Sequence, residues 1–273
     1  MSRSVEHLVL MGVSGCGKTT TLRMLLGLIR PDDGEMRIFD HEVPCGLPEV
    51  IDRVGAIVEN PTFAPNMSLR RNLEILAIST GVPSRRVTEV LLEVGLRGRE
   101  KAAFHTCSLG MKQRLAIAAT LLREPDLLIF DEPTNGLDPA GIEEVRRLLV
   151  ELSGEGVTVM VSSHLLDEID KMANVLGILA NGRMIFQGTR DQLFEHSIPD
   201  LVIETPDARA ALAQGITATP IAEGIRVSGL GKDQTAELVY RLAVAGVPIH
   251  GVRRVQQSLE DVFMDLTGRG GLL

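Results

Sequence analysis

The chain has 273 residues, 44% of them hydrophobic, which is enough to bury the cores of one or two domains, and we expect two. Its formal net charge of -8 argues against a protein that is held on nucleic acid mainly by phosphate contacts, so no nucleic-acid partner is expected. Three cysteines without metal-ligating spacing favour a reducing compartment, and the lack of a signal peptide or long apolar run predicts no membrane crossing by this chain itself.

A glycine-rich segment follows the first apolar run. Residues 8–11 (LVLM) read as a buried strand, and GVSGCGKTT at 12–20 stands between that strand and a segment of helical periodicity. Glycines let several backbone N–H groups approach one polyphosphate, as in the phosphate-binding loops of nucleotide hydrolases. We therefore predict a site for ATP or GTP in this loop; a glycine turn without ligand is the alternative. The predicted nucleotide-binding residues are Gly12, Val13, Ser14, Gly15, Cys16, Gly17, Lys18, Thr19 and Thr20.

Two side chains of this loop have the chemistry that a magnesium nucleotide requires. Lys18 is expected to reach the β- and γ-phosphates, and the hydroxyl of Thr19 to ligate Mg²⁺. The helix that begins near Lys18 would direct its positive end toward the anion. The buried stripe of this helix is predicted to consist of Leu22, Leu25, Leu26 and Ile29.

Two further apolar runs end in polar side chains. Residues 127–130 lead into Asp131 and Glu132, and residues 157–161 lead toward His164. Ligands of parallel α/β sheets bind beyond the carboxyl ends of the strands, so we expect these side chains to lie beside the phosphate-binding loop. Asp131 would hold Mg²⁺, Glu132 would deprotonate the attacking water, and His164 would contact the γ-phosphate.

Each of these residues also has a plainer interpretation. Asp131 and Glu132 could form the N-cap and acidic first turn of a helix, although Pro133 and Gly136 favour a loop there. His164 could be a cap or a hydrogen-bonded core histidine. Their common position beyond predicted strands favours the catalytic interpretation.

Two more segments complete an ordered set of motifs. CSLGMKQR at 107–114 precedes a helix, with Ser108 placed to cap it, and NGLD stands at 135–138. Together with the phosphate-binding loop and His164, these segments resemble the ATP-binding subunits of ABC transporters over about residues 5–189. The Ser-Leu-Gly-Met-Lys-Gln signature is similar to that of the branch of bacitracin, lantibiotic and drug-resistance exporters.

The resemblance implies an α/β P-loop NTPase fold, an ABC-type ATPase core with a helical subdomain at about 64–125, and ATP and Mg²⁺ as ligands. It also implies that a second ATP-binding subunit, expected to be an identical copy, completes each site. A signature at a helix N-terminus would contact the γ-phosphate of the ATP held by the second subunit; its residues are Ser108, Gly110 and Met111. Asp138 would cross the same interface. From the residues alone, Ser108 and Gly110 could equally be ordinary capping residues.

Two features depart from the usual pattern of this family. Glu59 follows a predicted strand where most members have glutamine, and a carboxylate favours Mg²⁺ but cannot donate a hydrogen bond to water. Glu59 is therefore assigned to the catalytic and metal-binding set, with a plain strand-end residue as the alternative. The loop also begins at residue 12, so amino-terminal strands and the aromatic residue that stacks on adenine are expected to be missing, which would weaken ATP binding.

The segment after Glu59 is where the family's helical subdomain receives a cytoplasmic helix of a polytopic membrane subunit. Docking of that subunit is therefore expected near residues 59–80. Residues 84–94 are predicted to form a further helix, and residues 139–152 the helix that returns the chain to the sheet. The apolar face of the first of these helices would consist of Val87, Val90, Leu91 and Val94.

A second module is expected to follow the ATP-binding domain, which we place at residues 1–198. In residues 199–273, strands are predicted at 201–204, 216–219, 224–227 and 247–255, and helices at 207–214 and 232–245. This β-α-β-β-α-β order predicts a small ferredoxin-like α+β accessory domain. The end of the chain, 258–267, resembles the final helix of drug-resistance-type ABC ATPases.

The sequence therefore predicts an ATPase that dimerises around ATP and drives a separate membrane subunit. We expect it to be cytoplasmic and peripheral on the inner face of the cell membrane, exporting a drug, an antimicrobial peptide or a similar amphipathic compound. Two alternatives remain: a soluble ABC-type ATPase without a transport role, and a structural subunit impaired in hydrolysis.

Overall fold

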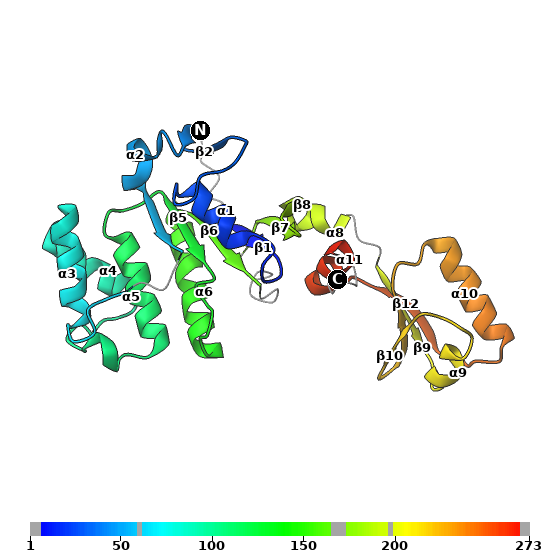
Figure 1. Ribbon diagram of the computed structural model, residues 1–273. Coiled ribbons are helices and arrows are strands. Elements are labelled where there is room, and N and C mark those ends of the chain that lie inside the picture. Colours follow the sequence, from blue (N-terminus) through cyan, green and yellow to red (C-terminus); the bar gives the residue numbers. More distant parts are fainter. Residues whose placement is uncertain (1–6, 59–61, 165–172, 196–198, 268–273) are drawn as a thin grey trace. The chain divides into compact units, whose positions relative to one another are not determined.

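The computed structural model describes residues 7–58, 62–164, 173–195 and 199–267 (Figure 1). The chain divides into two compact units, Met1–Gly188 and Thr189–Leu273. This division lies ahead of helix α8 (Arg190–Glu195), whereas the boundary expected from the sequence follows that helix. Among the described helices, none has the length and apolar character needed to cross a bilayer.

The first unit is built on a six-stranded sheet in the order β4-β5-β6-β1-β7-β8. In this order, neighbouring strands from β4 to β7 pair in parallel. The apolar runs that were expected to form buried strands are β1, β5 and β6, at the centre of the sheet. The third of these runs is shifted from its predicted position at 157–161 and extends to Ser163. The bounds are β1 (His7–Met11), β4 (Val54–Ile57), β5 (Leu127–Asp131), β6 (Thr158–Ser163), β7 (Val175–Ala180) and β8 (Arg183–Thr189).

Helix α1 (Lys18–Leu25) packs against the sheet through Leu22. Leu26, just past the end of the helix, joins Leu22 in a core with Leu10 and Ile129. The predicted stripe was wrong at its end, because Ile29 is 38% exposed. The helix stops at Leu25, and Gly27 then takes a positive φ of 67°, which turns the chain out of the helical register.

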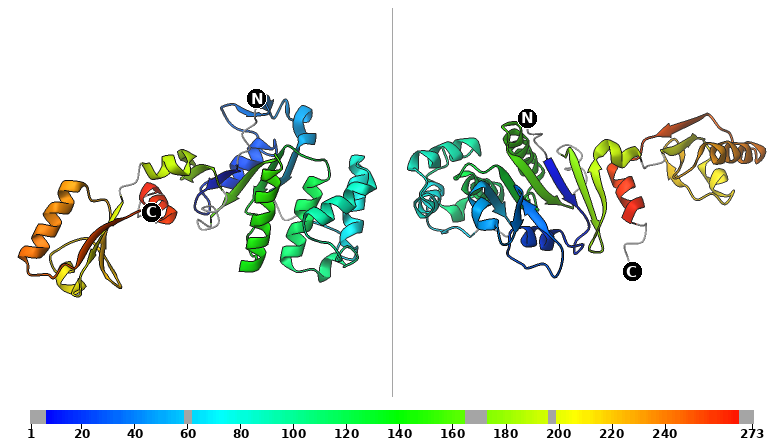
Figure 2. Two further views of the ribbon diagram at one scale, coloured as in Figure 1. Left: turned by 180° about the vertical axis from the view of Figure 1, so that it is seen from behind. Right: turned by 90° about the horizontal axis from the view of Figure 1, so that it is seen from above.

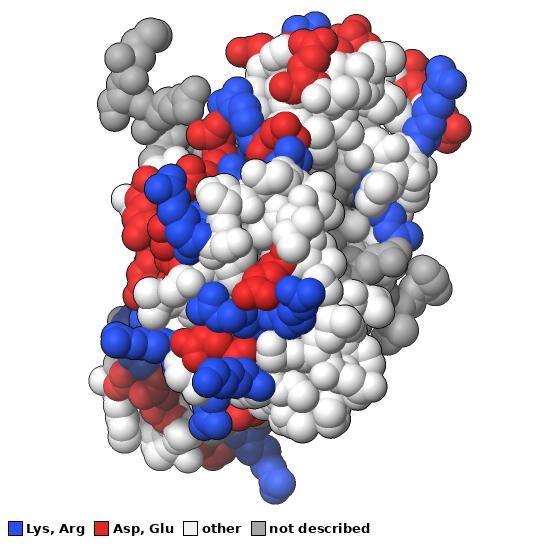
Figure 3. Space-filling model, turned by 90° about the vertical axis from the view of Figure 1, so that its left-hand side faces the viewer, with Lys and Arg blue, Asp and Glu red and all other residues white. Residues whose placement is uncertain are grey.

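The helical subdomain consists of α3 (Leu69–Thr80), α4 (Ser84–Glu93) and α5 (Leu109–Leu121), with a short 3₁₀ turn, η2 (Phe104–Thr106), between the last two. The predicted apolar face of α4 is confirmed, because all four of its residues, including Val94 just past the helix, are buried. The outer face of this region carries acidic and basic side chains side by side (Figure 3), in keeping with ion pairs such as Arg86–Glu93.

A small hairpin in the first unit has no counterpart in the sequence analysis. Strands β2 (Met36–Ile38) and β3 (His41–Val43) pair antiparallel, and helix α2 (Leu47–Val50) and the 3₁₀ turn η1 (Ile51–Arg53) lead from them to β4. Phe39 and Asp40 at its turn both have positive φ, which is the backbone of a two-residue hairpin turn.

The predicted helix at 139–152 is confirmed as α6 (Pro139–Gly154).

The second unit has a four-stranded antiparallel sheet in the order β10-β11-β9-β12. Its apolar core lies between this sheet and two helices, of which α10 runs along the sheet (Figure 2). Strands β10 and β12 begin later than predicted. The bounds are β9 (Asp200–Glu204), α9 (Ala208–Leu212), β10 (Thr219–Ile221), β11 (Gly224–Val227), α10 (Lys232–Val244), β12 (Gly251–Val255) and α11 (Leu259–Thr267).

Candidate functional site

The carboxyl ends of β1, β5 and β6 form one edge of the central sheet. Strand β6 pairs in parallel with both of the others, which places Asp131 opposite Ser162 and Met11 opposite Ser163. The loop at 12–20 follows β1, and His164 follows β6. The sequence prediction that these segments converge is therefore confirmed.

The loop at 12–20 depends on its first glycine for its shape. A Cβ on Gly12 would lie 2.2 Å from the Sγ of Cys16 and 2.6 Å from the carbonyl oxygen of Leu179, so no larger residue fits there without displacement. Gly15 and Gly17 both have positive φ, where side chains are strained. Cys16 is buried, whereas residues 13–15 are exposed, so one side of the loop is open to a ligand.

The ammonium group of Lys18 lies at the centre of the site. Its side chain is only 5% exposed, and its Nζ donates hydrogen bonds to the carbonyl oxygens of Gly12 at 2.7 Å and Val13 at 3.3 Å. The same Nζ lies 3.6 Å from Oε1 of Glu132. A buried cation requires such partners, and their positions hold it between the loop and the end of β5.

Thr19 and Asp131 lie side by side. The hydroxyl of Thr19 donates a hydrogen bond of 2.6 Å to Oδ2 of Asp131, and the hydroxyl of Ser162 donates to its Oδ1. Ser162 also accepts a hydrogen bond of 2.9 Å from the backbone N–H of Glu132. The sequence analysis gave Ser162 no role, because only the register of β5 and β6 brings it to Asp131.

Glu132 stands in the loop after β5 and not at the start of a helix. Its φ of 47° is rare for a residue with a side chain, and α6 begins only at Pro139, so the helix-cap alternative is wrong. Oε2 of Glu132 lies 2.8 Å from Nδ1 of His164. The structure thus brings the two residues into direct contact and leaves the carboxylate between Lys18 and His164.

The cluster combines the ammonium group of Lys18, the carboxylate of Glu132 and the imidazole of His164 with two side chains whose oxygen atoms suit Mg²⁺, Thr19 and Asp131. The described residues contain no group of three or more histidines, cysteines and carboxylates that could enclose a metal by themselves. Mg²⁺ in nucleotide sites is usually held by one or two carboxylates together with phosphate oxygens and water, and the adjacent Thr19 and Asp131 fit that pattern.

The remaining predicted residues lie elsewhere or outside the described part. Ser108 caps α5 by accepting a hydrogen bond from the N–H of Met111, and Asp138 caps α6 by accepting one from Gly141. Both capping residues are exposed at the starts of their helices. In the part of the chain that the structure describes, no hydrogen bond or ion pair joins Ser108, Gly110, Met111 or Asp138 to the cluster around Lys18. Glu59 lies outside the described residues.

Residues 3–135 match the family model of the ABC transporters. The bacitracin transport ATP-binding protein BcrA of Bacillus licheniformis is 38% identical over 288 residues, which cover 98% of this chain and 94% of that protein. The protein of the same name from Enterococcus faecalis is 36% identical over 271 residues, covering 96% of this chain and 88% of that protein.

Solved structures agree with these similarities. CbiO1 from Clostridium perfringens, part of the ABC transporter complex cbiONQ, superposes with a TM-score of 0.64 at 28% identity, over 70% of this chain and 80% of that chain. The relatives named here are transport proteins, which favours a transporter subunit over an ABC-type ATPase without a transport role. The chain therefore belongs to the ATP-binding subunits of the ABC transporters, as an ATPase coupled to transport.

Proposed function

We propose that this subunit dimerises around Mg-ATP and drives the export of a drug, an antimicrobial peptide or a similar amphipathic compound. The observation that carries the proposal is the assembly of Lys18, Asp131, Glu132 and His164 at one edge of the sheet. The nature of the cargo is supported by relatives whose names state bacitracin transport, and by the lantibiotic transport protein SrtF, which is 37% identical over 182 residues.

Each residue of the cluster has a role that its position supports. Lys18 would bind the β- and γ-phosphates, and Thr19 and Asp131 would hold Mg²⁺. When bound, this metal would offset charge on the phosphate oxygens. Glu132 would accept the proton of the attacking water, and His164, within hydrogen-bond distance of its carboxylate, would orient that carboxylate and contact the γ-phosphate. Glu59 is proposed as a further metal ligand and catalytic residue.

The dimer would place the start of α5 against the partner's nucleotide. A helix N-terminus attracts anions, and nothing lies within 4 Å of the position that a Cβ on Gly110 would take. Ser108, Gly110 and Met111 would therefore meet the γ-phosphate of the second subunit, with Asp138 at the same interface. Their capping bonds support this role, because they fix the two exposed helix starts.

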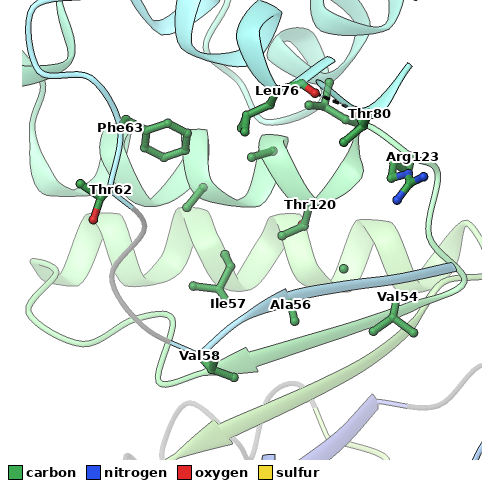
Figure 4. Close-up of a pocket in the computed structure, with 14 residues that line it drawn as sticks. Val54, Ala56, Ile57, Val58, Thr62, Phe63, Leu76, Thr80, Thr120 and Arg123 are labelled. Atoms are coloured by element: carbon green, nitrogen blue, oxygen red, sulfur yellow. Dashed lines mark hydrogen bonds between the residues drawn. The ribbon is translucent and has the colours of Figure 1, made fainter. Parts of the chain in front are cut away.

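A hollow beside the helical subdomain supports docking of the membrane subunit near residues 59–80. It has a volume of about 510 Å³ and lies between β4 and helices α3 and α5. Ile57 of β4, Leu76 of α3 and Phe63, which lies between these two elements in the chain, line it (Figure 4). An apolar hollow of this kind suits the side chains of a short cytoplasmic helix, through which the subunit would be held at the inner face of the membrane.

The second unit is proposed to be a ferredoxin-like accessory domain. Its β-α-β-β-α-β succession of elements and the strand order β10-β11-β9-β12 support that assignment.

Replacement of the proposed base tests the central claim. Glu132→Gln should abolish ATP hydrolysis and trap a dimer in Mg-ATP, because the amide keeps the shape of the side chain but cannot accept the proton. ATP turnover and molar mass by light scattering measure both effects. Glu151→Gln, the same change on the exposed face of α6, should leave both unchanged. Turnover that survives Glu132→Gln, or a variant that stays monomeric in Mg-ATP, would contradict the proposal.

The cargo is tested in the cells that carry the gene. Glu132→Gln in the chromosomal copy should make these cells more sensitive to bacitracin or to a lantibiotic, measured as the minimum inhibitory concentration. Unchanged sensitivity to a panel of amphipathic peptides and drugs would contradict export while leaving the ATPase activity in place.

A further inference from the structure

We infer that Ser162 is a positioning residue of the hydrolytic site, one that orients both acidic residues at the end of β5. The inference rests on the proposed function of that site. Ser162 lies in β6, opposite Asp131 in the parallel pairing of the two strands. Its side chain is fully buried, so its hydroxyl depends on hydrogen-bond partners within the protein.

The hydroxyl of Ser162 joins two groups whose chemistry fixes its hydrogen bonds. An ionised carboxylate can only accept, so the hydroxyl proton goes to Oδ1 of Asp131. A backbone N–H can only donate, so an oxygen lone pair accepts the N–H of Glu132 at 2.9 Å. One small side chain thus links a carboxylate and the peptide of the next residue.

The first of these bonds orients Asp131. Its Oδ1 accepts from Ser162 and its Oδ2 accepts from Thr19 at 2.6 Å, so both oxygens of the carboxylate are held. The carboxylate is thereby kept beside the other proposed Mg²⁺ ligand. Partners of this kind set the orientation of a metal-binding side chain without touching the metal.

The second bond holds the backbone of Glu132 in a conformation that it does not favour. With a φ of 47°, this residue lies in the left-handed region, which persists only where the surroundings impose it. Its N–H donates to both the carbonyl oxygen of Ser162, at 3.2 Å, and the hydroxyl of Ser162. Removing the hydroxyl leaves the longer bond alone to hold the peptide that directs Glu132 toward His164.

The test is Ser162→Ala in the full-length protein. On ADP-loaded protein, the Kd for Mn²⁺, used in place of Mg²⁺ and measured by electron paramagnetic resonance, should rise about 10- to 100-fold. The kcat of ATP hydrolysis should fall by a similar factor, while ADP binding in the presence of a chelator stays unchanged. Ser162→Thr, which retains the hydroxyl, should restore most of both.

One control and one substitute variant separate positioning from simple support of the sheet. Ser153→Ala removes a buried serine hydroxyl from α6 and should change neither metal affinity nor kcat. Should Ser162→Thr fail to fold, Ser162→Cys, whose thiol is a weaker donor, should fall between serine and alanine.

Three outcomes have separate meanings. Wild-type Mn²⁺ affinity and kcat in Ser162→Ala would overturn the inference. If Ser162→Ala loses ADP binding in the presence of the chelator and also melts at a lower temperature, the inference is likewise overturned, because that pattern indicates structural support alone. A wild-type protein that binds no ADP at all would instead contradict the proposed function, and the inference with it.

Discussion

The contacts of Gly12 make a specific prediction about the phosphate-binding loop. In Gly12→Ala the new methyl group would collide with Cys16 and with the carbonyl of Leu179, and such overpacking costs about 1–3 kcal/mol. We expect urea unfolding to show this loss together with weaker nucleotide binding. Adding Cys16→Ala should restore only part of it, because the Leu179 carbonyl remains.

A matched glycine gives the control for that experiment. Gly154 lies at the end of α6, and nothing is within 4 Å of its Cβ position. Gly154→Ala should therefore leave stability unchanged or raise it by up to about 1 kcal/mol. If Gly12→Ala is as stable as Gly154→Ala, the packing of the loop described above is incorrect.

Gly110 allows the dimer to be tested separately from the fold. Gly110→Ala meets no neighbour in the subunit and replaces glycine by the best helix former, so its melting temperature should not fall. In the proposed dimer the methyl group would face the partner's nucleotide, and a misplacement there can reduce hydrolysis on the order of 100-fold. The measurements are turnover, Mg-ATP-induced dimerisation and ATP binding to the monomer, which should be retained. Wild-type turnover would argue against a shared site.

At the scale of single elements, a salt bridge joins helix α11 to the sheet of the second unit. Arg226 on β11 contacts Asp200 at 2.6 Å and Asp261 on α11 at 2.8 Å. Burial alone would raise the pKa of Asp261, but hydrogen bonds from Ser258 and the charge of Arg226 outweigh it and lower the pKa below its ordinary 3.8. The ionised carboxylate is therefore favoured by folding.

The direction of that shift predicts how acid affects this helix. Because the pKa is lower in the folded state, its contribution to stability is complete above pH 3.8 and is lost as the pH falls through the lowered value. Asp261→Asn should destabilise the second unit by about 1 kcal/mol at neutral pH, since the pair is partly exposed. The difference from wild type, from urea unfolding followed between about pH 5 and pH 2, should shrink toward acid. Glu260→Gln, in the same turn, is the control, and a difference independent of pH would contradict the assignment.

The strand ends explain why much of the site could be predicted. Asp131, Glu132 and His164 each follow an apolar run within a few residues, and Lys18 follows the loop after another. Parallel pairing brings such strand ends together whatever the exact register. Ser162 also follows an apolar run, but its contact with Asp131 could not be predicted in this way, because that contact depends on the register of two strands. A shift of one residue would turn its side chain to the opposite face of the sheet.

The β2–β3 hairpin and the end of α1 were not predicted from the sequence. The turn of the β2–β3 hairpin has Phe39 and Asp40 at positive φ, where glycine or asparagine would have marked it. Ile29 continues the helical spacing of α1 in sequence, but Gly27 ends the helix before it is reached. At the hairpin turn Phe39 gives no local signal for a positive φ, whereas Gly27 is a helix-ending signal that the apolar spacing did not take into account.

At the scale of the whole molecule, each unit has a hydrophobic core of its own. The core of the first unit consists of buried residues of the central sheet, of the helices that pack on it and of the helical subdomain. That of the second lies between its antiparallel sheet and helices, with Leu242 among its fully buried residues. Separate cores predict that the two units unfold in separate steps.

Calorimetry with and without ligand tests this expectation. Mg-ADP at about 100 times its Kd should stabilise the first unit by about 2.7 kcal/mol and raise only that transition, because only this unit contains the phosphate-binding loop. Leu242→Ala should destabilise the second unit by about 2–5 kcal/mol and lower only the other transition. A single transition that responds to both changes would show that the two units fold as one, and the second unit would then contribute directly to the stability of the nucleotide site.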